Sequence, residues 1–116
     1  MKTFLLTAAM FLTYSIGFSQ EQDQPHYFAQ CLLNIEDRQD FDNLNLDLKA
    51  NPFVKVVRLD WHTKRMFLLT QDINGLPLET LNSWLGTYVS TASCIQIGLH
   101  GVDQVNPYPF TNCPNQ

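Results

Sequence analysis

The sequence lacks the surplus of positive charge that nucleic-acid-binding proteins carry. Seven Lys and Arg residues stand against eleven Asp and Glu residues, which gives a net charge of −4 and an isoelectric point near 5.1. A protein that neutralises phosphates needs a basic stripe or patch on its surface. The charge balance therefore argues against a nucleic-acid partner.

The chain also lacks the short motifs of common catalytic chemistry. It contains no Gly-x-Ser-x-Gly elbow, no His-Glu-x-x-His motif and no glycine-rich phosphate loop. Acidic residues cluster between Glu36 and Asp47, but at helical spacing they read as a solvated face near a helix N-terminus. Their spacing is not that of a calcium-binding loop. We therefore expect a protein that is not an enzyme.

No apolar run is long enough to cross a bilayer, which takes about 20 residues. Residues 1–19 instead combine Lys2, a short apolar stretch and the small residues Gly17 and Ser19, the pattern of a signal peptide. No cysteine stands at the cleavage point, so we expect no lipid anchor. A leader that ends in Phe-Ser-Gln resembles those of exported bacterial proteins, which predicts a periplasmic or secreted location.

The part of the chain after the leader is just under a hundred residues long, enough for one small domain. Its hydrophobic fraction of 45% and charged fraction of 16% fit a globular core. We divide it into a polar lead-in at 20–25, a domain at 26–103 and a Pro-rich C-terminal tail at 104–116.

Two hydrophobic periods follow each other along the domain. A period of two predicts strands, and a helical period predicts two helices. The predicted strands are residues 26–35, 53–61, 65–70 and 94–99. The first predicted helix spans 36–51, with Phe41, Leu44 and Leu48 buried. The second opens at Pro77, with a buried stripe of Leu78, Leu81, Trp84, Leu85 and Tyr88.

The predicted order is strand, helix, strand, strand, helix, strand, which is the signature of an α+β ferredoxin-like sandwich. Right-handed crossovers place both helices on one face of a four-stranded antiparallel sheet, with the first and third strands in the centre. One face of that sheet is left without helices.

From His26 to Asp103 the pattern resembles the heavy-metal-associated domain family of metallochaperones. The likeness is best at residues 51–60, through the hairpin to Thr70, and at 76–81. The resemblance implies a ferredoxin-like fold and soft-metal binding by a Cys-x-x-Cys pair in the loop after the first strand. Here the corresponding loop, residues 34–40, has no cysteine.

Three cysteines in an oxidising compartment predict one disulfide and one free thiol, with three possible pairings. The alternation places Cys31 in the core, Cys94 on the outward face of the last strand and Cys113 on the tail. We expect a Cys94–Cys113 bridge that fixes the tail and contributes about 3 kcal/mol. The alternative is an exposed redox or intermolecular thiol at Cys113.

The histidines suggest a second kind of site. If the first and last strands pair with Gln30 opposite Gln96, the same register puts His26 opposite His100. Two such imidazoles, with a third ligand such as Asp103, could hold Zn or Cu. The alternative is a pair of solvated strand-end histidines, and a slip of one residue would separate them.

The helix-free face of the sheet carries more apolar side chains than a solvated face needs. The residues expected there are Phe28 and Leu32 on the first strand, Val54 and Val56 on the second, and either Met66 with Leu68 or Phe67 with Leu69 on the third. Such a patch marks a protein partner or a homodimer contact. Alternatively, the tail folds back and covers it with Tyr108 and Phe110.

These observations predict a small exported binding module of the bacterial envelope, without a cofactor, that uses the helix-free sheet face. The alternative is a metal or thiol carrier of the heavy-metal-associated type, with Cu or Zn at a relocated site. That site would be His26 with His100, or the cysteines.

Overall fold

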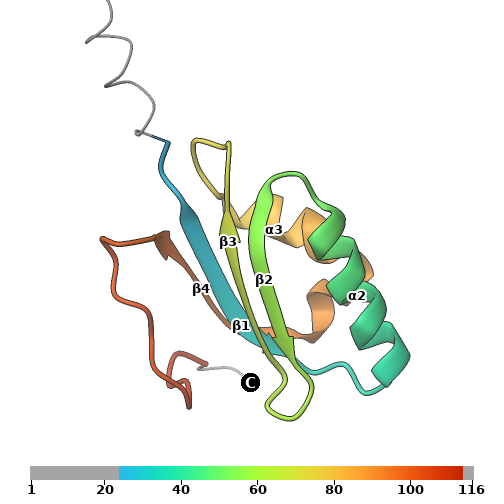
Figure 1. The fold of residues 1–116 in the computed structure, drawn as a ribbon. Helices are drawn as coiled ribbons and strands as arrows, with labels where there is room; N and C mark the ends of the chain where they lie inside the picture. The colour runs from blue at the N-terminus through green and yellow to red at the C-terminus, as the bar shows by residue number, and fades with distance from the viewer. Residues whose placement is uncertain (1–23, 114–116) are drawn as a thin grey trace, which may run out of the picture.

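The computed structural model describes residues 24–113, which form an α+β fold (Figure 1). The signal peptide predicted for residues 1–19 lies outside this range. The elements in chain order are β1 (Tyr27–Leu33), α2 (Arg38–Ala50), β2 (Val54–Asp60), β3 (Arg65–Thr70), α3 (Leu78–Leu85), a 3₁₀ helix η2 (Gly86–Thr91) and β4 (Ala92–Leu99).

The four strands form one antiparallel sheet in the order β2-β3-β1-β4. The two central strands are therefore β1 and β3, as the predicted ferredoxin-like layout requires. Figure 1 shows α2 and α3 on one side of this sheet and residues 100–113 on the other. None of the helices within residues 24–113 is both long and apolar enough to cross a membrane.

The first helix, α2, follows the sequence prediction closely. The Asp37 carboxylate caps its N-terminus by accepting a hydrogen bond from the Gln39 N–H, at 2.8 Å. Lys49 lies in its last turn, where a cation suits the negative end of the helix dipole. The buried residues are Phe41, Leu44 and Leu48, as predicted.

The second helix is shorter than predicted. The predicted stripe ran past Gly86 to Tyr88, but Gly86 adopts a φ of +61° and ends α3. A positive φ is incompatible with a right-handed helix and costs glycine little. Within α3, Leu81 and Leu85 are buried, whereas Leu78, which was expected in the stripe, is 50% exposed.

The prediction that Val54 lies on the helix-free face is wrong. The pairing of β2 with β3 shifts register between Val54 and Val56, so one residue of β2 bulges out of the ladder. This shift turns Val54 into the helix-covered core, where it is 6% exposed. Beyond the shift, Val57 and Leu59 also pack against that core.

The third strand resolves the two alternatives left by the sequence. Met66 and Leu68 are buried on the helix side, with 1% and 0% exposure. Since side chains alternate along a strand, Phe67 and Leu69 lie on the helix-free face. We call this helix-free face of the sheet the outer face.

Candidate functional site

One half of the outer face, over β1 and β4, is closed by the chain itself. Phe28 was predicted to contact a partner there, but its side chain has no solvent exposure. Its register partner on β4 is Gly98, where an added Cβ would lie 2.8 Å from the Phe28 ring and 3.0 Å from the Asp103 Cβ. The missing side chain lets the ring lie over the strand, and the loop after β4 encloses it. Phe28 is therefore a packing residue.

A chain of amide hydrogen bonds holds the tail against this half. The Gln30 Nε2 donates to the Gln96 Oε1 at 2.8 Å and to the Asn106 carbonyl at 3.0 Å. The Asn106 N–H donates to the Gln96 Oε1 at 2.9 Å, and the Gln96 Nε2 donates to the Gln104 carbonyl at 2.8 Å. Gln30 is 6% exposed, and these bonds give its buried Nε2 two acceptors.

The far end of the tail is joined to β4 by the predicted Cys94–Cys113 disulfide, with Cα atoms 4.5 Å apart. Cys94 was expected to be exposed, but it is 5% exposed. It lies where β4 shifts register against β1, with a φ of +56°. The Asn112 Nδ2 donates to the Ile95 carbonyl at 3.3 Å and adds a second attachment beside it.

The remaining cysteine, Cys31, is buried in the helix-side core, as the alternation predicted. Burial raises the pKa of its thiol to about 12, because the apolar surroundings disfavour the thiolate. At neutral pH the thiol is protonated and out of reach of solvent. Cys31 is therefore part of the helix-side core and not an exposed thiol.

We call the part of the outer face on β1 and β4, which residues 104–113 cover, the covered half. Aromatic rings lie along its border with the rest of the outer face. The Arg65 guanidinium lies over the Tyr108 ring, 4.6 Å from its centroid, and the Tyr108 ring meets Phe110 edge-on at 5.7 Å. The Phe28 and Phe67 rings are stacked across the same border, with centroids 6.2 Å apart.

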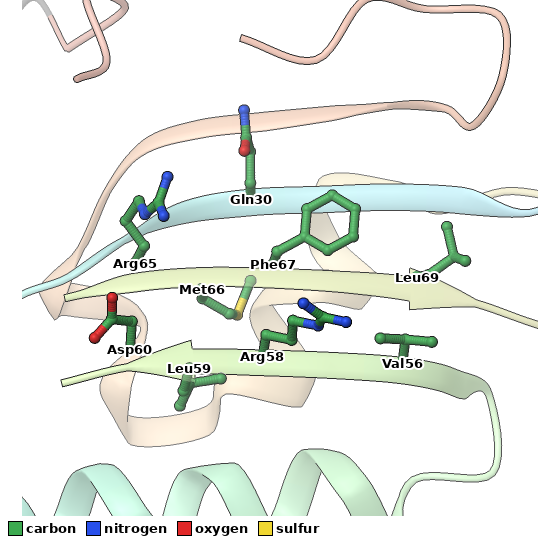
Figure 2. Close-up of a pocket in the computed structure, with 9 residues that line it drawn as sticks. All are labelled: Gln30, Val56, Arg58, Leu59, Asp60, Arg65, Met66, Phe67 and Leu69. Carbon is green, nitrogen blue, oxygen red and sulfur yellow. The ribbon is translucent and has the colours of Figure 1, made fainter. Parts of the chain in front are cut away.

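The other half of the outer face, over β2 and β3, contains a hollow of about 490 Å³ (Figure 2). We call this region the open half. Its apolar residues on the outer face are Val56, Phe67 and Leu69, and its polar residues are Arg58, Asp60 and Arg65. Gln30 of β1, which belongs to the covered half, lines the hollow at the border. Leu59 and Met66, which point away from these side chains in the close-up, complete the lining.

The charges of the open half are unequal. The Asp60 carboxylate accepts hydrogen bonds from the Thr63 hydroxyl at 2.9 Å and from the His62 N–H at 3.0 Å. These bonds, chiefly the one from Thr63 and secondly the one from His62, hold the pKa of the Asp60 carboxyl below its usual range. Asp60 thus stabilises the hairpin turn between β2 and β3. The two arginines outnumber this one carboxylate, so the open half has a net positive charge.

Of the four residues predicted to contact a partner, Val56 alone lines this hollow. Leu32 also lies on the outer face, but at the other end of β1. There it lines a separate hollow of about 520 Å³ with the β2–β3 turn and the start of β4. The structure therefore does not bring Phe28, Leu32, Val54 and Val56 together into one surface.

The two histidines of the predicted metal site are neighbours across the strands. The His100 N–H donates to the His26 carbonyl at 2.9 Å, in the register set by Gln30 opposite Gln96. The His26 Nδ1 lies 2.7 Å from the Thr70 carbonyl, a bond that requires the proton on Nδ1. Within residues 24–113, no three His, Cys, Asp or Glu side chains gather closely enough to hold a metal ion.

The third ligand considered for that site has another role. One carboxylate oxygen of Asp103 accepts a hydrogen bond from the Leu99 N–H at 2.7 Å, which closes the turn after β4. This bond commits one Asp103 oxygen to the backbone of the turn. Of the two ring nitrogens of His26, Nδ1 is the one that makes a hydrogen bond within residues 24–113.

Sequence reasoning did not single out the two arginines of the open half. Arg58 alternates with Val56 and Asp60, so a signal was present in the period-two pattern of β2. That pattern identifies the face of each residue, but it does not show that Arg58 and Arg65 border one hollow, which depends on the pairing of β2 with β3.

No protein-family model matches this chain, and no curated protein matches it. Among solved structures, a chain titled "Crystal structure of PH0061" resembles it with a TM-score of 0.46 and 13% sequence identity. The match covers 72% of this chain and 55% of that chain.

Proposed function

We propose that the chain is a small exported binding module of the bacterial envelope, without catalytic activity, that holds a protein partner on the open half of its outer face. The observation that carries this proposal is the hollow between β2 and β3, next to a half that the tail covers. An apolar patch left on an otherwise covered sheet is typical of an interaction site.

The position of the hollow favours a polypeptide over a small molecule. It lies on the surface of the sheet beside the edge strand β2, and its apolar residues form a floor rather than an enclosing wall. Small-molecule sites usually surround most of the ligand surface. The Cys94–Cys113 disulfide is compatible with the oxidising compartment that export implies.

Site-specific photo-crosslinking in the producing cell tests the proposal. A photoreactive residue replaces Leu69 in the open half, and a matched control replaces Leu46, which is 63% exposed on α2. We expect one adduct of defined mass from position 69 and none of that mass from position 46. Adding Phe67→Asp to the first variant should abolish the adduct, because it places a charge on the apolar floor.

Two results would defeat the proposal. One is the absence of any protein adduct at position 69, and the other is the same set of adducts at positions 69 and 46. An adduct of twice the chain's mass would identify the partner as a second copy of the protein.

A metal carrier with a relocated site is the second candidate, supported by the adjacency of His26 and His100. Equilibrium dialysis of the oxidised protein against Zn or Cu measures its uptake directly. Stoichiometric uptake that His100→Ala removes would establish this function. Absence of uptake at micromolar metal would remove it.

A further inference from the structure

The two arginines of the open half have no acidic partner in the described chain. Asp60 is the acidic residue that lines the hollow, and the hairpin turn uses its carboxylate. Among residues 24–113, the ion pair that forms is Arg38 with Asp42 on α2. Arg58 and Arg65 are both exposed, so their guanidinium groups are available to an anion.

The rest of the molecule has the opposite charge. The whole chain has a net charge of −4, and α2 carries acidic residues along its exposed surface. Two copies meeting through their open halves would bring four arginines and two Asp60 carboxylates together. At least two of the arginines would be left without an acidic partner, which disfavours a contact between copies. The charges of the open half therefore favour a different, acidic chain.

The open half borders a free sheet edge. In the order β2-β3-β1-β4, β2 has a neighbour on one side only. The unpaired backbone groups of an edge strand can pair with an extended segment of another chain. The register shift between Val54 and Val56 limits the regular part of this edge to Val56–Asp60.

The side chains along this edge define what such a segment would carry. On the outer face it would pass beside Arg58, at a strand spacing of about 4.8 Å, within reach of a glutamate on the added strand. On the helix side it would pass beside Val57 and Leu59, which are only half-buried. A segment with acidic residues on its outer face and apolar residues on its helix-side face would match the side chains of β2 on both sides of the sheet.

We infer that the occupant of the open half is an extended segment of a partner polypeptide, with alternating acidic and apolar residues, that adds to β2 as a fifth strand. This inference rests on the proposed function. Its backbone pairs with Val56–Asp60. Its carboxylates meet Arg58, its apolar side chains cover Val57 and Leu59, and the hollow accepts the stems of its acidic residues.

The test is a titration of the oxidised, ¹⁵N-labelled chain with a capped eight-residue peptide of alternating Glu and Val, followed by NMR. We expect saturating amide shifts centred on Val56–Asp60. Arg58→Glu should weaken binding at least tenfold. The matched control Lys49→Glu, on the exposed last turn of α2, should change it less than twofold. Added salt should weaken binding, since the ion pairs are at the surface.

Two control peptides separate the parts of the inference. A peptide with Lys in place of Glu tests the charge, and one with N-methyl groups on alternate residues tests the strand pairing. Both should fail to bind. Arg58→Gln removes the charge without reversing it and should give an intermediate loss, which guards against a folding defect in Arg58→Glu.

Any of four results overturns the inference. They are no shift at Val56–Asp60 with millimolar peptide, equal binding of the Lys peptide, equal binding of the N-methylated peptide, and concentration-dependent shifts at Val56–Asp60 without peptide, which indicate a second copy. If the Leu69 cross-link still captures another protein while the acidic peptide fails, the proposed function stands and this inference alone falls.

Discussion

The two halves of the outer face differ in what lies over them. Above β1 and β4, the tail packs down on the sheet and Phe28 has no exposure. Above β2 and β3, Val56, Phe67 and Leu69 form the floor of a hollow that the described chain leaves open. Apolar alternation alone therefore does not identify a binding surface, because a distant segment can cover one half and spare the other.

The covered half is also built differently. Its attachment to the tail uses side-chain amides and a disulfide instead of a further strand pairing. Amide groups such as that of Gln30 are stable in a buried setting only when each finds a partner. The open half instead has two exposed arginines at its rim, whose charged groups are stable because water solvates them. This difference predicts how each half responds to substitution.

The largest effect should come from truncating the buried aromatic ring of the covered half. Phe28→Ala should lower the free energy of unfolding by about 3–5 kcal/mol, since it removes a fully buried ring and leaves a cavity. Phe67→Ala, in the half-exposed position across the border, should cost about 1–2 kcal/mol. Urea unfolding of the two oxidised variants measures both. Equal costs would erase the distinction between the halves.

Removing the disulfide should have the next largest effect. The double variant Cys94→Ser with Cys113→Ser should lose about 3 kcal/mol, because the unfolded chain gains the freedom of a 19-residue loop. The tail should then loosen and expose apolar surface. Thermal unfolding and binding of an apolar dye measure the two effects. Unchanged dye binding would show that the tail stays down without the bridge.

The amide chain can be broken at its centre. Gln30→Ala should cost about 1–3 kcal/mol, since it leaves the Asn106 carbonyl without its donor in a buried setting. The matched control is Gln71→Ala, whose amide makes an exposed bond to the Pro52 carbonyl and should matter by less than about 0.5 kcal/mol. If both variants cost the same, the tail is held by something other than these amides.

Asp60 should give the smallest effect, visible as a pH dependence. Its folded-state pKa lies below its usual value, so its contribution to stability is present above about pH 4 and is lost as the pH falls through the folded pKa. The stability difference between the wild type and Asp60→Asn should therefore shrink on acidification. A difference that stays constant from pH 6 to pH 2.5 would contradict the role assigned to its bonds with Thr63 and His62.

Local sequence signals were sufficient for the order of elements and the layout of the sheet. The cap at Asp37, the period of Phe41, Leu44 and Leu48 and the stop before Pro52 lie within a few residues of each other, so α2 was predictable. The register of Gln30 opposite Gln96 followed from pairing the middles of two strands.

The face assignments failed where the backbone departs from a simple period. One extra residue in β2 moved Val54 to the core, and a positive φ ended α3 at Gly86. The burial of Phe28 depends on Gly98 and on a tail that approaches from far along the chain. An alternation pattern within one strand contains no information about such long-range contacts. The division of the outer face into a covered and an open half could therefore not be predicted from it.

Hydroxyl-radical footprinting of the folded, oxidised chain tests this division most directly. Mass spectrometry of the digested protein compares the oxidation rate of Phe28 with that of Phe67. These are the same residue type on neighbouring strands, so their intrinsic reactivity is equal. We expect oxidation of Phe67 and protection of Phe28 until the protein is unfolded. Equal oxidation of both rings in the folded chain would contradict a covered and an open half.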